Sequence, residues 1–224
     1  MPQALKPQGF HPRCPCVLLL DTSQSMDGPK IEQVTSGLHT LKQELLQDSL
    51  ARARVELSVV LFNEQIEEIQ PFAPIDSFMP PVLQAAGRTA MGAAIAYALE
   101  SLSRRKRDYN DRGIPYYQPL LFLITDGAPT DPAALDNIRG ELLQRQRRAK
   151  LTFSAIGVDQ ADMNLLASLS AGPAYQLTGM QMTSLFKWIS KSTSAGSRGS
   201  GEQGQGAPPP PSAVRIHHQA QDRD

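Results

Sequence analysis

Short, wholly apolar segments that stop at an acidic residue constrain this fold more than any other feature. Residues 14–20 and 120–124 carry almost only apolar side chains, and Asp21 and Asp126 follow them closely. A continuous apolar run of this length predicts a strand buried on both faces, as in a parallel sheet. Residues 55–62 are rich in β-branched side chains and predict another strand.

Helical patterns separate these strands. Five apolar residues follow the first strand at spacings of 3, 4, 3 and 4, the period of one buried helix stripe: Ile31, Val34, Leu38, Leu41 and Leu45. Further helices are expected near residues 91–102, 132–148, 162–168 and 183–190, and further strands at 66–69, 151–158 and 174–177. This alternation predicts an α/β fold: a doubly wound, mostly parallel sheet with helices on both faces and one antiparallel edge strand.

Composition divides the chain into three parts. Residues 1–13 contain three prolines and no periodicity, which is typical of a flexible lead-in. Residues 14–192 carry the whole α/β pattern and form the predicted domain. Residues 193–224 are dominated by Gly, Ser and Gln with four consecutive prolines, and predict a disordered tail.

Charge and cysteine content exclude several classes of protein. Lys+Arg and Asp+Glu both number 22, so the net charge is zero, which argues against a nucleic-acid partner. No apolar run is long enough to span a membrane, and no signal peptide is evident. Cys14 and Cys16 are the only cysteines, too few for a disulfide scaffold, and with His11 they lack the ligands of a zinc site. We therefore expect a cytoplasmic protein.

Oxygen-bearing side chains follow the predicted strands. Asp21, Ser23 and Ser25 come after the first strand, Thr89 precedes a helix, and Asp126 ends the central strand. Because the carboxyl ends of parallel strands share one edge, these side chains are expected to meet there. Two carboxylates and three hydroxyls suit Mg²⁺, Mn²⁺ or Ca²⁺ rather than zinc, and the sequence favours none of the three decisively.

Such a ligand set leaves a bound Mg²⁺ with a coordination position that an Asp or Glu from a protein partner can complete. Gly127 lets the backbone approach the site closely. Arg88 either steers an acidic ligand to the metal or is a plain loop residue. The loops at 63–88 and 106–118 are expected to set specificity.

Asp21-Thr-Ser-Gln-Ser25, Thr89 and Thr125-Asp126-Gly127 together resemble the metal-ion-dependent adhesion site (MIDAS) of the von Willebrand factor type A (VWA) domain family. The resemblance implies that Ser23, Ser25 and Thr89 contact the metal, with Asp21 and Asp126 as direct or water-bridged ligands. It also implies a binding module rather than an enzyme. Within the family the chain resembles the bacterial tellurium-resistance TerY-type proteins, which implies a stress system with protein kinase or phosphatase partners.

Two other functions stay open. A metal-assisted phosphatase would use Asp21 as its nucleophile, but Ser23 stands where such enzymes carry a second Asp. A scaffold would bind through the proline run at 208–211. The basic clusters at 104–107 and 145–148 fall at predicted helix ends, and are either solvated helix termini or a surface for phosphate or an acidic partner.

Overall fold

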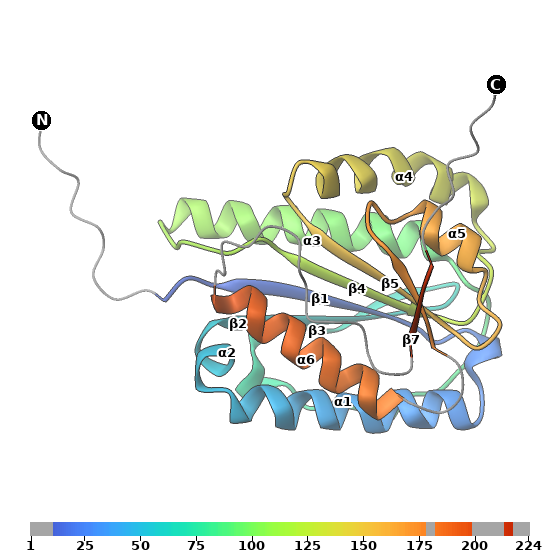
Figure 1. The fold of residues 1–224 in the computed structure, drawn as a ribbon, viewed down its shortest axis with the longest axis horizontal. Helices are drawn as coiled ribbons and strands as arrows, with labels where there is room; N and C mark the ends of the chain where they lie inside the picture. Colours follow the sequence, from blue (N-terminus) through green and yellow to red (C-terminus); the bar gives the residue numbers. More distant parts are fainter. Residues whose placement is uncertain (1–10, 178–181, 199–212, 217–224) are drawn as a thin grey trace, which may run out of the picture.

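The computed structural model describes residues 11–177, 182–198 and 213–216, which form a sheet with helices on both faces (Figure 1). The strands are β1 Cys14–Asp21, β2 Val55–Phe62, β3 Ile66–Pro74, β4 Leu120–Thr125, β5 Thr152–Val158, β6 Ala174–Leu177 and β7 Ala213–Ile216. The helices are α1 Pro29–Gln47, α2 Ser49–Arg54, α3 Met91–Asp111, α4 Pro132–Arg147, α5 Met163–Ser168 and α6 Met182–Arg198, with short 3₁₀ turns at Gln24–Met26 and Ile75–Ser77.

The sheet order is β3-β2-β1-β4-β5-β6-β7. β1 lies between β2 and β4 and is parallel to both, and β5 and β6 continue the parallel series. β3 is the antiparallel edge strand that the sequence predicts. The predicted doubly wound α/β fold is confirmed.

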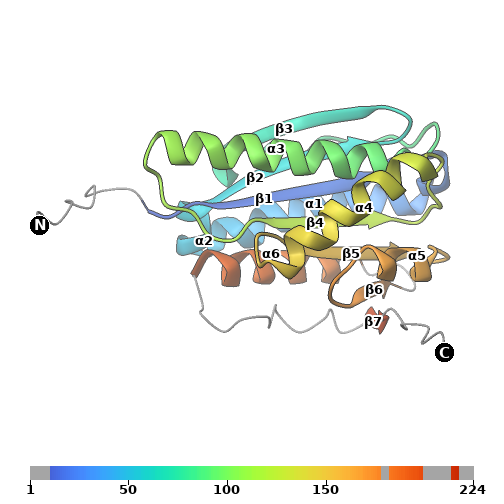
Figure 2. The same ribbon diagram turned by 90° about the horizontal axis from the view of Figure 1, so that it is seen from above.

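Alternate residues of the central strands supply two separate cores. In β1, Leu18 and Leu20 pack under α1 and α6, whereas Val17 and Leu19 pack under α3 and α4. Figure 1 shows α3 and α4 above the sheet and α1 and α6 below it, and Figure 2 views the sheet with α3 and α4 in front. Because both faces are covered, every residue of β1 is buried, which explains the continuous apolar run that predicts it.

Several elements extend beyond their predicted limits. β3 continues through Pro71 to Pro74, although these prolines predict a loop, because an edge strand tolerates residues without an N–H. α3 continues to Asp111, and α6 to Arg198, past the expected domain boundary at residue 192.

The predicted disordered tail needs a correction. Residues 213–216, which lie inside it, form β7 and pair with β6 in antiparallel register, so the sheet has antiparallel strands at both edges. The edge of β6 offers unpaired backbone groups that a short segment can satisfy without a long apolar sequence. The proline run and the two histidines at 217–218 lie outside the described residues.

The crossovers determine which loops share an edge. β1, β2 and β4 run in the same direction, so the residues that directly follow them, 22–28, 63–65 and 126–131, lie at one edge of the sheet. Residues 86–90 return to this edge after β3 and are hydrogen-bonded to Thr22, Gln24 and Asn63. Residues 112–119 lie at the opposite edge, where Pro115 O accepts a hydrogen bond from Arg13 N before β1 begins. The expectation that residues 106–118 border the site is therefore wrong, because α3 carries the chain across the whole sheet. Among the described residues, no helix is long and apolar enough to cross a membrane.

Candidate metal centre

Three loops at the carboxyl edge of the sheet are tied together by backbone hydrogen bonds. Gln24 N donates to Gly87 O at 3.0 Å, which joins the loop after β1 to the loop before α3. Thr130 N donates to Thr89 O at 2.8 Å, which joins that second loop to the one after β4. Gly87 has a φ of 75°, a left-handed conformation that suits glycine. The site residues are thus positioned by backbone contacts between distant segments.

The predicted ligands converge on one point, which Gly127 marks. A methyl group added to Gly127 would lie 3.1 Å from Thr89 Oγ1, 3.3 Å from Ser25 Oγ and 3.7 Å from Asp21 Oδ2. Ser25 Oγ also donates a 2.7 Å hydrogen bond to Asp126 Oδ1. Three of the five predicted ligands therefore surround the small space that a glycine at position 127 leaves open, and Asp126 is joined to them through Ser25.

Asp21 is fully buried and held from two sides. Its Oδ1 accepts a 2.8 Å hydrogen bond from Ser23 N, and its Oδ2 accepts one from the Thr125 hydroxyl. Burial raises the pKa of Asp21 above its usual value, and the negative charge of Asp126 raises it further, while the hydrogen bonds oppose both effects. A cation beside these two carboxylates would favour their charged forms.

The fifth predicted ligand, Ser23, completes the group. Its hydroxyl lies 3.0 Å from that of Ser25, and only 2% of its surface is exposed. All five predicted residues therefore belong to one cluster of hydroxyl and carboxylate oxygens. Among the described residues no group of three or more His, Cys, Asp or Glu is placed to hold a metal, so a candidate cation site depends on this mixed set.

Lys30, which sequence reasoning missed, points into the same cluster. Its ammonium group forms an ion pair with Asp126 Oδ2, donates to Ser25 O at 3.1 Å and lies 3.9 Å from Asp159 Oδ2. A signal for it exists in the sequence: a lysine in the first turn of a helix opposes the helix dipole unless an acid compensates it. Here Asp126 is that acid.

Thr125 is the second residue that the prediction missed as a participant. Its hydroxyl donates to Asp21 and accepts from Gly127 N at 3.2 Å, so it connects both carboxylate loops. Arg88, by contrast, is exposed beside Thr89 and forms no ion pair with any described residue. Its role in steering an acidic ligand to the metal therefore stays a prediction. Gly127 lies beside the oxygens of Thr89, Ser25 and Asp21, and the prediction that it takes part in partner binding stays a prediction.

The oxygen set fits a divalent cation. Hydroxyl and carboxylate oxygens are the ligands that Mg²⁺, Mn²⁺ and Ca²⁺ accept, and the residues that would hold the ion are Asp21, Ser23, Ser25, Thr89 and Asp126. The two cysteines cannot take part: both are buried in β1, and burial raises the pKa of the Cys16 thiol to about 12.

An open α/β sheet with polar ligands gathered beyond the carboxyl ends of its strands defines a ligand-binding α/β domain. The chain belongs to the von Willebrand factor type A domain family, whose family model matches residues 16–187.

Solved structures share this fold at low sequence identity. The vWF domain of the type V pili tip protein Mfa5 from Porphyromonas gingivalis has a TM-score of 0.58 and 10% identity, over 84% of this chain and 97% of that chain. Proximal thread matrix protein 1 from the mussel byssus has a TM-score of 0.56 and 17% identity, over 81% and 48%.

The ArnB paralog VWA2 from Sulfolobus acidocaldarius has a TM-score of 0.53 and 18% identity, over 82% of this chain and 46% of that chain. The chain thus spans about half the length of the mussel and Sulfolobus proteins. No curated protein matches the sequence.

Proposed function

We propose that this domain binds a protein partner through a divalent cation. Asp21, Ser23, Ser25, Thr89 and Asp126 hold the ion, and an Asp or Glu of the partner completes its coordination. The observation that carries the proposal is the convergence of Thr89, Ser25 and Asp21 oxygens around Gly127. One solved structure of the mussel protein has a zinc-occupied MIDAS motif, which supports a cation site in this fold.

Mg²⁺ is the ion that we propose first, with Mn²⁺ and Ca²⁺ as alternatives, because all three accept a set of hard oxygens. Hydroxyl ligands are neutral, so a bound cation keeps net positive charge and attracts a further carboxylate. Lys30 must release Asp126 when the ion binds, and Asp159 lies close enough to receive its ammonium group.

An exposed apolar residue beside the site extends the proposed contact surface. Val82, in the loop between β3 and α3, is 84% exposed. Val82 borders a groove of about 300 Å³ that Thr22, the neighbour of Asp21, also lines. A partner that brings its acid to the metal can therefore cover Val82 with an apolar side chain.

The proposal is tested first by metal binding and then by capture. Calorimetric titration with Mg²⁺ and Mn²⁺ should show one site in the full chain and none in Asp126→Ala. Asp76→Ala, which removes an exposed acid elsewhere, should bind like the unsubstituted chain. Thr89→Ala should weaken binding less than Asp126→Ala, because it removes a neutral ligand.

Affinity capture from cell extract, with Mg²⁺ against EDTA, then identifies the partner. Capture that needs Mg²⁺ and fails with Asp126→Ala supports a metal bridge. Equal capture in the presence of EDTA would contradict it.

The placement of this chain within the von Willebrand factor type A family is a separate proposal. The opening Asp21-Thr-Ser-Gln-Ser-Met26 supports a TerY-type role in a bacterial, cytoplasmic stress or tellurium-resistance system with kinase or phosphatase partners. A non-catalytic role is proposed with it, since Ser23 replaces the second acid of a phosphatase. Recovery of a kinase or phosphatase in the Mg²⁺-dependent fraction would support this placement. A phosphoester turnover that vanishes with Asp21→Asn would instead favour an enzyme.

A further inference from the structure

A second charged site lies far from the candidate metal centre, between the C-terminal parts of α3 and α4. A hollow of about 340 Å³ is lined there by Ser103, Lys106, Glu141, Gln144, Arg145, Arg148 and Lys150. Both helices begin at the metal edge and cross the sheet, so this hollow lies at the opposite end of the domain (Figure 1). Its volume is within the range of about 300–1,000 Å³ that small-ligand sites occupy.

The first basic cluster separates into paired and unpaired side chains. Arg104 lies over the Tyr97 ring, Arg105 binds Glu56 and Asp108, and Arg107 pairs with Glu100. Lys106 forms no ion pair with any described residue, although it is only half exposed and faces α4. Because α3 continues to Asp111, this cluster lies within the helix and not at the helix end that the sequence predicts. Three of its cations have partners, and Lys106 has no ion pair among the described residues.

The second cluster divides in the same way. Arg145 donates to Leu99 O and to the Ser103 hydroxyl, both at 3.0 Å, and pairs with Glu141, so it joins α4 to α3. Arg148 and Lys150 form no ion pair within the described ranges. Because Glu141, the one acid that lines the hollow, is already paired with Arg145, three positive charges stay uncompensated around a single space.

The surroundings of Lys106 disfavour its charged form. Burial lowers the pKa of Lys106 below its usual value, and the positive charges of Arg145 and Lys150 lower it further. An anion in the hollow would remove this repulsion and replace water around the ammonium group with a charge-assisted hydrogen bond.

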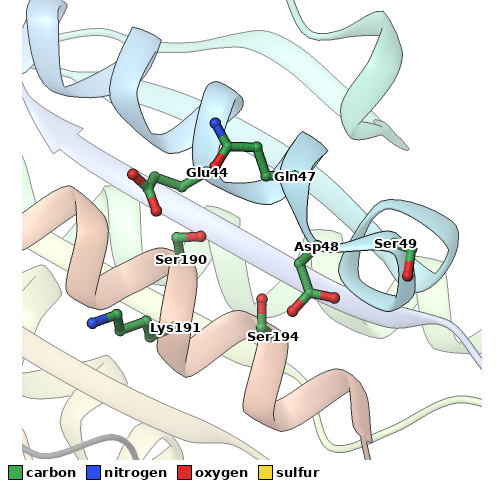
Figure 3. A pocket seen from close by; sticks show the side chains of 7 residues that line it. All are labelled: Glu44, Gln47, Asp48, Ser49, Ser190, Lys191 and Ser194. Atoms are coloured by element: carbon green, nitrogen blue, oxygen red, sulfur yellow. The ribbon is translucent and has the colours of Figure 1, made fainter.

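A second hollow differs from this one because it is lined by both acidic and basic side chains. The space of about 540 Å³ between α1 and α6 is lined by residues of both signs, among them Glu44, Asp48 and Lys191 (Figure 3). Lys187 pairs with Glu44 at its border, and Asp48 caps α2. The charges there compensate one another, so that hollow selects no class of ligand.

We propose that the hollow lined by Lys106, Arg148 and Lys150 binds a phosphate-bearing anion. Three uncompensated cations favour a ligand that carries more than one negative charge. A single carboxylate carries only one. The planar guanidinium of Arg148 matches the oxygens of a phosphate group, and the two lysines contribute point charges. This site goes beyond the proposed metal bridge and shares no residue with it.

The test is calorimetric titration of the full chain with inorganic pyrophosphate in the presence of EDTA. Lys106→Met and Arg148→Gln should each weaken binding about tenfold, as expected for the loss of one charge-assisted contact. Arg107→Gln removes a neighbouring exposed cation of α3 and should leave the affinity within about twofold, as an exposed pair permits. Arg148 is exposed, so its variant does not endanger the fold.

Nuclear magnetic resonance of the lysine side chains gives an independent measurement. Pyrophosphate should raise the pKa of Lys106 toward that of a free lysine. A phosphoserine peptide used as a second probe distinguishes a phosphorylated partner from a free phosphate compound, according to which binds more tightly. Equal losses in Lys106→Met and Arg107→Gln, equal binding of a poly-glutamate peptide, or no binding of either phosphate probe would each overturn the proposal.

Discussion

At the scale of single residues, Lys30 is the side chain that the sequence analysis did not anticipate. A lysine is common on helix surfaces, and only the fold shows that the first turn of α1 faces Asp126. Oxygen ligands are recognisable from sequence because their types follow from the chemistry of the ion and their positions follow from the ends of predicted strands. The sequence signal for Lys30 is weaker: a lysine in the first turn of a helix suggests a compensating acid but does not identify Asp126 as that acid.

Replacement of Lys30 by Met should strengthen metal binding. The ammonium group occupies Asp126 Oδ2, and its removal leaves that oxygen free for the ion. Since 31% of the Lys30 side chain is exposed, the Coulomb energy of the pair is discounted to about 1 kcal/mol, which corresponds to roughly fivefold in affinity. Calorimetry with Mn²⁺ measures the change, and Lys191→Met is the control. Unchanged affinity in Lys30→Met would show that the lysine does not compete with the ion.

Gly127→Ala tests the space at the centre of the candidate site. Its methyl group would lie 3.1 Å from Thr89 Oγ1 and 3.3 Å from Ser25 Oγ, and so displace the ligand oxygens. We expect roughly a tenfold loss of Mg²⁺ affinity with little loss of stability, since misplacement by a fraction of an ångström weakens a coordination site. Gly140→Ala, in α4, meets no atom within 4 Å and should leave metal binding intact. Full affinity in Gly127→Ala would place the ion elsewhere.

At the scale of elements, the start of α4 is predicted correctly, but the contact that Asp131 makes is not. The sequence predicts a helix near residues 132–148, and α4 does begin at Pro132. The Asp131 side chain, however, accepts hydrogen bonds from Gly92 N at 3.1 Å and Ala93 N at 2.9 Å. It caps α3, a contact between segments 39 residues apart that a local rule does not contain.

Asp131→Ala should therefore destabilise the domain by about 1 kcal/mol, and up to about 2, the usual cost of losing a helix cap. The loss should appear as a lower urea midpoint with an unchanged m-value. Asp136→Ala, which breaks only a surface pair with Arg139, should change stability by less than about 0.5 kcal/mol. Equal effects of the two substitutions would argue that the Asp131 bonds contribute nothing.

The buried strands were the most predictable elements, because burial on both faces excludes polar residues from them. Edge elements were predicted less well: β3 is longer than expected, and β7 was not expected at all. Edge strands are stabilised by backbone pairing with a neighbour, so their sequences carry little of the apolar pattern that identifies a strand. Four of the five site residues were predictable because they lie at or just after the ends of β1 and β4, whereas Thr89 lies in the loop before α3.

At the scale of the whole molecule, the two proposed sites lie at opposite ends of the sheet. Mg²⁺ and pyrophosphate should therefore raise the unfolding free energy independently, each by about 2.7 kcal/mol at a hundred times its dissociation constant. Their effects should add within about 0.5 kcal/mol, as for distant sites that share no residues. Thermal unfolding with each ligand and with both measures this, at free ligand concentrations corrected for the complex that Mg²⁺ and pyrophosphate form with each other in solution. A marked departure from additivity would reveal coupling across the sheet.

The pairing of β7 with β6 has a further consequence. A strand from the distal end of the chain covers the last parallel strand, and the chain between Arg198 and Ala213 joins it to α6. Cleavage by a protease within that connection would turn β7 into a separate peptide held by four residues of backbone pairing. Once that peptide diffused away, the domain would keep its two cores but expose a short template to which an extended segment of another molecule can add.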